Sequence, residues 1–437
     1  MRKSILLGLI VMLTLPVAAQ QQLLEKYRGM ALDYNYDLKS AERNIRASME
    51  LERMAGADLK PKLAGGANFQ YVGNPSELTL DLPALGDPFT FQGKNARYGG
   101  ALSLVQPLYT GGRLLETLRM AQHQQLLAKN QAQVVRSAVC YQTDIQYWST
   151  VARAELVAIS TEFRNSMASL VQTIRERVEV GLVDSQDLLM AEVKLNEAEY
   201  QLLQAKNSFE TGRMALNSMI GVDLKEATPV ETEVPAAVPD TLLRASGYER
   251  PEVQVAANRV KIAQSSRKIN DSKYLPQLSI GAEGSYGSPG YNFKPDMDLN
   301  YGVYAKLSVP IFEWGKRRSE KRLGTQKVGM AEDLLNQVTD QVRLEAETAR
   351  LSLNQALQRV ALAEASLAKA RENEQKASER YAEGKSSILE VIDAQVYRLT
   401  SQMNYTQAKA TAQGSYSELL KALNEYGTDE NIVSLKE

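Results

Sequence analysis

Two carboxylic acids lie three residues apart near the end of the chain, at Glu390 and Asp393. On a helix, that spacing places both side chains on one face, where they could attract a cation or exchange protons. Nothing around them is typical of a glycosidase, an enzyme class built on a carboxylate pair. Taken alone, the pair is therefore most simply a solvated acidic face.

The chain offers little other chemistry. It has one cysteine, Cys140, so an internal disulfide is impossible and a zinc site of the Cys-rich type is excluded. Its one histidine, His123, lies within a polar helical run, where a solvated or packed side chain is expected. We find no convincing acid–base or metal-binding cluster. The sequence thus predicts no enzyme, no metal site and no cofactor.

The balance of acidic and basic side chains indicates which classes of partner to expect. Among 437 residues, 51 basic side chains are matched by 52 acidic ones. Such a chain gives no electrostatic reason to expect nucleic acid as a partner. Its length could accommodate two or three ordinary domains.

Residues 1–19 are predicted to be a secretory signal peptide. Basic residues 2–3 precede an apolar stretch over 5–15, and small residues lead to an expected cleavage after Ala19. A transmembrane anchor is the alternative, but this stretch is too short to cross about 30 Å of lipid comfortably. We therefore expect the mature protein to be periplasmic, secreted, or held in an outer membrane by β-strands.

The chain contains an internal duplication. The segment PLYTGGR at 107–113 is matched by PIFEWGK at 310–316, an offset of 203. Pro61 matches Pro276 at an offset of 215, so the first half carries twelve extra residues, in a Pro- and Gly-rich loop. The pattern predicts a first repeat over 20–222, a Pro-rich linker over 223–239, a second repeat over 240–426 and a tail over 427–437.

Long helices are predicted in both repeats. No Pro or Gly interrupts 113–180, which would be about 100 Å long if helical throughout. Residues 316–383 repeat this pattern with only Gly324 and Gly329 inside it. Residues 23–60 are also rich in helix formers. A heptad-like seam follows the first long helix. It comprises Leu188, Ala191, Leu195, Ala198, Leu202, Ala205, Phe209 and Leu216.

Four segments alternate between apolar and polar residues, as strands do. They are 61–72, 96–109, 276–287 and 300–312. Each is about as long as a tilted strand that crosses a membrane, and alternation with aromatic residues near the ends is typical of a membrane barrel. A small soluble sheet is the alternative. Four strands cannot close a barrel, and an open edge cannot face lipid, so strands that span a membrane would have to be pooled by several chains.

The repeated motif lies where the second and fourth strands lead into the long helices. Pro is tolerated at a strand end, and Gly lets the backbone turn sharply. We therefore assign the strand-to-helix exits to Pro107, Gly112, Pro310 and Gly315.

With these features the chain resembles TolC-type outer-membrane efflux proteins. The resemblance covers residues 21–426 and is most specific at RVEVGLVDSQDLLMAE (177–192) and RYAEGKSSILEVIDAQ (380–395). It implies a mainly α fold with membrane β-structure: each chain of a homotrimer gives four strands to a twelve-stranded β-barrel, which continues into a long periplasmic α-helical barrel. The linker and the tail would lie in an equatorial region around its middle.

The same resemblance implies function and partners. Such proteins are exit ducts of tripartite efflux or type I secretion systems in the outer membrane of Gram-negative cells, in contact with lipid. They dock on a periplasmic adaptor (membrane fusion) protein, which couples them to an inner-membrane transporter of RND or ABC type. They conduct passively and catalyse no reaction.

The resemblance also assigns residues. The helical tips that meet the adaptor are Val180, Gly181 and Leu182 in the first repeat and Glu383, Gly384 and Lys385 in the second, with Ser185 and Ser387 expected as caps. Glu390 and Asp393 match the carboxylates that narrow the periplasmic aperture.

A polar latch between the two tip regions is expected from Asp187 and Tyr381, which match two of the family's positions. The family's basic position holds Ser386 here, so we expect Lys385 to replace it, pairing with Asp187, or the tyrosine hydrogen bond to carry the latch.

Two other kinds of protein stay open. An exported coiled-coil structural or scaffold protein would explain the helices but leave the alternating, duplicated strand pairs unexplained. A secreted enzyme is the weaker alternative, given the scarcity of catalytic residue types.

Overall fold

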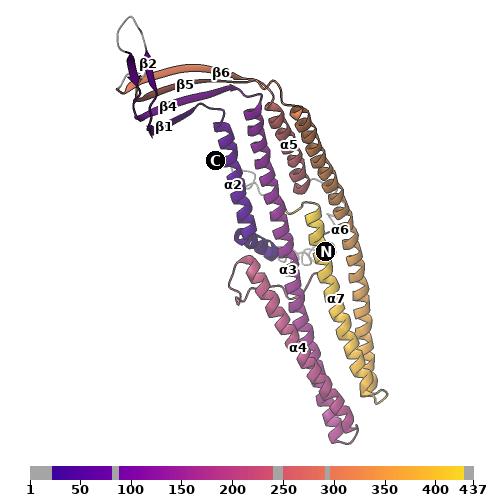
Figure 1. Ribbon diagram of the computed structural model, residues 1–437. Coiled ribbons are helices and arrows are strands. Elements are labelled where there is room, and N and C mark those ends of the chain that lie inside the picture. Colours follow the sequence, from indigo (N-terminus) through magenta and orange to yellow (C-terminus); the bar gives the residue numbers. More distant parts are fainter. Residues whose placement is uncertain (1–21, 81–87, 240–249, 291–295, 428–437) are drawn as a thin grey trace, which may run out of the picture. The chain divides into compact units, whose positions relative to one another are not determined.

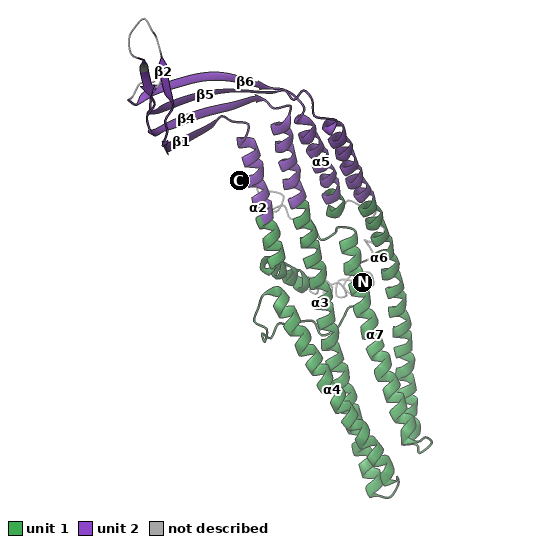
Figure 2. Cartoon of the chain, viewed as in Figure 1, with its two compact units in different colours: residues 1–43, 129–254, 337–437 green, residues 44–128, 255–336 purple. Residues whose placement is uncertain are grey.

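The computed structural model describes residues 22–80, 88–239, 250–290 and 296–427. The predicted signal peptide and all but the first residue of the predicted tail lie outside these ranges. The chain divides into two units (Figure 2). One comprises residues 1–43, 129–254 and 337–437, and the other comprises 44–128 and 255–336.

The second unit contains one antiparallel sheet of four long strands (Figure 1). The order is β1-β4-β5-β6, so β1 and β6 are the edges. The four strands expected from sequence alternation are thereby confirmed. Their bounds are Lys62–Tyr71 for β1, Ala96–Tyr109 for β4, Gln277–Ser288 for β5 and Asp298–Ser308 for β6.

A short hairpin occupies the extra residues of the first repeat, where we expected only a loop. Its strands are β2 (Glu77–Leu80) and β3 (Phe89–Gln92), which pair with each other and not with the long sheet. Four-residue strands carry too little alternation to stand out within a Pro- and Gly-rich stretch. The sequence pattern therefore missed them.

The helices reproduce the duplication. α3 (Arg113–Glu179) and α6 (Lys316–Ala382) both have 67 residues, and their first residues are 203 positions apart. α2 (Tyr36–Ala57) and α5 (Pro251–Ser272) both have 22 residues, with first residues 215 positions apart. α3 is followed by α4 (Ser185–Ile220), and α6 is followed by α7 (Ile388–Ala422). Each pair forms a helical hairpin. Both offsets found in the sequence thus hold for the helices.

One helical prediction is corrected. Residues 23–60 were expected to be rich in helix, but the helix that begins at residue 22 stops at 34, and α2 starts after Asn35. Asn35 ends one helix and begins the next: its side-chain oxygen accepts a hydrogen bond of 2.9 Å from the backbone N–H of Leu38. This is the usual role of asparagine before a helix, where it satisfies a free donor.

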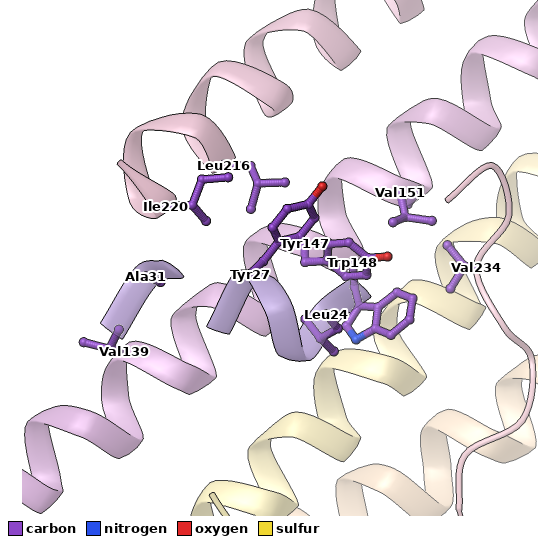
Figure 3. Packing of buried hydrophobic residues seen from close by; sticks show 11 residues of the cluster. Leu24, Tyr27, Ala31, Val139, Tyr147, Trp148, Val151, Leu216, Ile220 and Val234 are labelled. Carbon is purple, nitrogen blue, oxygen red and sulfur yellow. The ribbon is translucent and has the colours of Figure 1, made fainter. Parts of the chain in front are cut away.

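The first unit has apolar cores between its helices. Every residue of the predicted heptad seam on α4 is buried or half-buried. The largest core contains aromatic residues from two helices (Figure 3). The rings of Tyr147 and Trp148 on α3 are 4.9 Å apart, and Tyr27 lies 5.9 Å from Tyr147. Val234 of the Pro-rich linker packs into the same core, so the linker is a part of the folded structure.

A buried ion pair ties three parts of the first unit together. The guanidinium of Arg28 donates two hydrogen bonds of 2.6 Å to the carboxylate of Asp144, whose side chain is 0 % exposed. The hydroxyl of Tyr426 donates a third, at 2.8 Å. A carboxylate buried this deeply is stable only when its charge is matched and its oxygens are hydrogen-bonded.

We predict that Asp144→Asn costs about 3 kcal/mol of folding free energy, because it leaves the Arg28 charge half-buried without its counter-charge. Glu199→Gln is the matched control, since it removes an ion pair with Arg164 whose side chains are 50 % and 38 % exposed. Such a pair contributes less than about 1 kcal/mol. Thermal unfolding in detergent, followed by circular dichroism, compares the two. Equal losses in the two variants would show that the buried pair has no special role.

Candidate functional site: the two helical tips

The first helical tip is a tight reversal at Gly181. Its backbone is left-handed, with φ of 76°, and its N–H donates to the carbonyl of Val178 at 2.9 Å. The N–H of Leu182 donates to the carbonyl of Arg177 at 2.9 Å. This pair of bonds is the Schellman arrangement, which ends a helix and favours glycine at the left-handed position.

The second tip has the same geometry. Gly384 has φ of 72°, and its N–H donates to the carbonyl of Tyr381 at 3.0 Å. The N–H of Lys385 donates to the carbonyl of Arg380 at 2.8 Å. The two glycines are 203 positions apart, so the duplication extends to individual hydrogen bonds.

The returning helices are capped differently. Ser387 caps α7 as expected, and it forms a capping box with Glu390. The expected cap Ser185 is wrong: α4 is capped by Asp184, whose side chain accepts from the N–H of Gln186 at 2.8 Å. The hydroxyl of Ser185 instead bonds to the Asp184 carboxylate. Asp184 has the extended backbone that a cap requires, and its carboxylate is the stronger acceptor.

The two helical tips expose side chains of different character. Val180 and Leu182 are two of the most exposed apolar residues among the described helices and turns of this unit. At the second tip, Lys385 and Glu383 form an ion pair of 2.7 Å and are both exposed. One tip is thus apolar and the other is charged.

The two hairpins pack against each other behind the tips. Their shared core is formed by Val171, Ile174, Ala191, Tyr381, Ile388, Val391 and Ile392. Residues of α3 and α4 therefore contact residues of α6 and α7, which fixes the two tips relative to each other within one chain.

The predicted aperture carboxylates lie on the exposed side of α7. Glu390 and Asp393 are exposed, whereas Val391 and Ile392 between them are buried in the core. Glu390 is engaged locally: its carboxylate accepts from the backbone N–H of Ser387 at 3.4 Å and lies 4.0 Å from the guanidinium of Arg380. Among the described residues, no ion pair involves Asp393. Asp393 is therefore the less engaged of the two.

The predicted latch partners are not joined as expected. Lys385 pairs with its near neighbour Glu383, and no ion pair to Asp187 is found in the described part of the chain. The buried hydroxyl of Tyr381 has no hydrogen-bond partner there either. Neither version of the expected latch is therefore formed within one chain.

Arg177 contacts Tyr381 instead, and sequence reasoning missed it. Its guanidinium carbon lies 4.8 Å from the centre of the Tyr381 ring, and it donates to the Tyr381 carbonyl at 3.3 Å. A cation over an aromatic face is attracted by the ring electrons. Arg177 belongs to the last turn of α3, 204 positions from Tyr381 in sequence. Only its place in the tip motif could have drawn attention to it.

The strand-to-helix exits contain left-handed residues in both repeats. Gly112 and Gly315, predicted at these exits, have φ of 86° and 79°. Pro107 lies within β4, not at its end, and the strand continues to Tyr109 past an irregularity in the pairing. Proline cannot donate to the ladder, and the pairing with β5 shifts its register directly after Pro107. Pro310 lies beyond the end of β6, because this strand stops at Ser308, four residues before its predicted end.

The structure offers few signs of other sites. Among the described residues, no three His, Cys, Asp or Glu side chains are grouped so that they could hold a metal ion. Among the same residues, no helix has the length and apolar character needed to cross a membrane.

The chain is similar to known outer-membrane proteins. The family model for outer membrane efflux protein matches residues 28–222 and 242–425. The solvent efflux pump outer membrane protein SrpC of Pseudomonas putida is 24 % identical over 422 residues, which cover 90 % of this chain and 83 % of the relative.

Two solved structures share the fold. The CmeC outer membrane channel of Campylobacter jejuni aligns with a TM-score of 0.76 and 19 % identity, over 94 % of this chain and 88 % of that one. VceC of Vibrio cholerae aligns with a TM-score of 0.78 and 17 % identity, over 93 % and 97 %. The predicted fold class is thereby confirmed. Since the family model matches both repeats, the chain belongs to the outer membrane efflux protein family.

Proposed function

We propose that three copies of this chain form an exit duct through the outer membrane. The duct passively conducts substrates that an inner-membrane pump delivers through a periplasmic adaptor, and it catalyses no reaction. The observation that carries the proposal is the four-stranded sheet, whose two edges are open and whose apolar side chains are exposed. Membership of the efflux protein family supports it.

The physical reason for pooling chains lies in the backbone. In lipid, every backbone N–H and C=O must be hydrogen-bonded within the protein, so an open sheet edge is not tolerated. Barrels of this kind begin at about eight strands, and one chain supplies four long ones. Three copies would supply twelve, which closes the barrel and leaves a lumen wide enough for transport.

We assign the periplasmic aperture of this duct to Asp393, with Glu390 in a secondary role. Three copies would bring three of each carboxylate around the pore, where rings of acidic side chains favour cations. The exposed Asp393 is free to face the pore, whereas the Glu390 carboxylate is held by the cap of α7.

We predict that Asp393→Asn weakens block of the channel by divalent cations by about tenfold or more, equivalent to about 1.4 kcal/mol. Glu390→Gln has a smaller effect and keeps the capping box, because an amide oxygen can still accept from Ser387. Single-channel conductance in planar bilayers, with and without added divalent cation, measures both.

Channels that are blocked equally in both variants and the parent would move the aperture elsewhere. If the folded protein forms no channel and stays soluble without detergent, the exported scaffold protein becomes the better assignment.

We assign the latch that keeps the tips together to Arg177 and Tyr381. Their contact joins the end of α3 to the end of α6, so it links the two hairpins that would have to separate when the aperture widens. A partly desolvated cation–π contact is worth about 1 to 2 kcal/mol.

We predict that Arg177→Gln raises the fraction of time the channel spends in its largest conductance level, by about five- to thirtyfold. The matched control is Arg175→Gln, because Arg175 pairs with Glu192 inside the first hairpin, at 2.9 Å. Losing that pair leaves the contact between the hairpins intact. Bilayer recordings compare the two, and equal effects would refute the latch.

We assign adaptor docking to the tips, with the apolar first tip as the main contact. Burying an exposed leucine side chain in an interface contributes about 1.5 to 3 kcal/mol. Leu182, beside Gly181, is 75 % exposed in the described part of the chain.

We predict that Leu182→Ser weakens binding of the purified adaptor by about tenfold or more. Leu189→Ser is the control, since Leu189 is also exposed, at 63 %, but lies on α4 beyond the turn. Surface plasmon resonance on captured channel measures both. A loss for Leu189→Ser that matches the loss for Leu182→Ser would rule out a contact centred on the tip.

A further inference from the structure

The edge strands of the long sheet differ in exposure from their inner counterparts. Tyr301 on β6 is 81 % exposed, while Tyr98, its counterpart on the inner strand β4, is 44 % exposed. Tyr71 on β1 is 69 % exposed, against 52 % for its counterpart Tyr286 on β5. Each edge therefore lacks a neighbour that each inner strand has.

The internal duplication makes the pairing of β1 with β4 in the first repeat equivalent to the pairing of β5 with β6 in the second. In the first repeat, Lys62 on β1 pairs with Val105 on β4. In the second, Gln277 on β5 pairs with Ser308 on β6. Adding 215 to the number of Lys62 gives Gln277, and adding 203 to the number of Val105 gives Ser308. The two repeats thus pair their own strands in the same register.

One further pairing, β4 with β5, joins the two repeats. It places Leu104 opposite Ala282 and Ser103 opposite Glu283. The counterpart of β4 is β6, and the counterpart of β5 is β1. Both are edges, so within one chain this third pairing has no copy.

We propose that β6 of one copy pairs with β1 of the next in the register of β4 with β5. The two offsets then place Leu307 opposite Ala67 and Lys306 opposite Asn68, each across the boundary between copies. This inference rests on the proposed shared barrel and adds the residue-level contact that builds it. The contact is head-to-tail, with a different edge from each copy, and such contacts generate rings when the rotation closes.

The two faces of the strands support this register independently. It sets Val303 opposite Tyr71 on the apolar face and Tyr304 opposite Gln70 on the other face. A slip of one residue would turn every apolar side chain of one strand toward the polar face of its neighbour. Matching the faces thus excludes odd slips, and the repeat symmetry selects one register among the even ones.

The two repeats differ in sequence where β4 and β6 lead into the long helices. A side chain at Gly111 would meet the carbonyl oxygen of Ser272 at 2.7 Å and the Cβ of Leu275 at 2.8 Å. The counterpart of Gly111 is Trp314, which has a positive φ of 44° and is almost fully exposed. Gly111 lets the exit after β4 lie close to Ser272 and Leu275 of the second repeat. The side chain of Trp314 prevents the exit after β6 from lying equally close to a neighbouring copy. A test of the register therefore belongs in the middle of the strands.

Disulfide cross-linking tests the register. The variant Asn68→Cys/Lys306→Cys joins the proposed partners, whose Cα atoms would be about 4.5 to 5.5 Å apart, within reach of a disulfide. Asn68→Cys/Ser308→Cys and Asn68→Cys/Tyr304→Cys test slips of two residues in each direction. In the proposed register their Cα atoms would be about 7 to 8 Å apart, beyond that reach.

The single native cysteine does not interfere. Cys140 is buried on α3, and burial raises the pKa of its thiol to about 11, so little reactive thiolate is present at neutral pH. The single variants Asn68→Cys and Lys306→Cys show any background. The trimeric state and channel activity of each variant are measured in parallel, under reducing conditions.

We expect oxidation of Asn68→Cys/Lys306→Cys to give covalent dimers and trimers on non-reducing gels, at least fivefold more than either slipped pair, and reversed by a thiol reductant. A slipped pair that cross-links equally well, or a trimeric, conducting protein in which no pair cross-links, would overturn the register and leave the duct standing. A monomeric, non-conducting parent protein would overturn the shared barrel itself, and the register with it.

Discussion

The hydrogen-bonding needs of two sheet edges constrain the sheet of this protein and any assembly built on it. Among the described strands, β1 and β6 each have a neighbour on one side only, and each carries exposed apolar side chains. In water such edges invite aggregation, and in lipid each unpaired backbone group costs several kcal/mol. The constraint is relieved only by another strand, and the exactness with which the duplicated registers coincide makes a second copy of the same chain the natural source.

The helical unit obeys a different constraint, which is the pairing of charges that packing has buried. Lys409 is 1 % exposed, yet its ammonium group lies 2.8 Å from Glu155 and 3.2 Å from Glu233. Asp144 is matched by Arg28 in the same way. Glu233 lies in the linker, and Tyr426 follows α7, so these buried charges draw in the segments that connect and end the repeats. Removing one partner of such a pair would leave a buried charge without its counter-charge, which destabilises the folded state.

The two repeats share a backbone plan and differ in the side chains that meet a partner. Both tips turn on a left-handed glycine with the same two hydrogen bonds, but one exposes apolar residues and the other an ion pair. Both exits use a glycine, but Trp314 stands where the first repeat has Gly111. The two repeats therefore share the backbone of the tips and exits. Their exposed side chains differ, so the two tips present different surfaces to a partner.

The long helices and the four long strands, with their order, follow from the sequence, because short-range periodicity and the positions of glycine and proline set them. The hairpin of β2 and β3 and the helix break at Asn35 do not. The cap of α7 was expected at Ser387 and is confirmed, whereas the cap expected at Ser185 was wrong. The tertiary structure alone decided which side chains meet. It joined Arg177 to Tyr381, gave Lys385 to Glu383, and chose Asp184 over Ser185 as a cap. Arg177 and Tyr381 are 204 positions apart, so no local pattern predicts their contact, and the two local choices depend on the backbone conformation that each turn adopts.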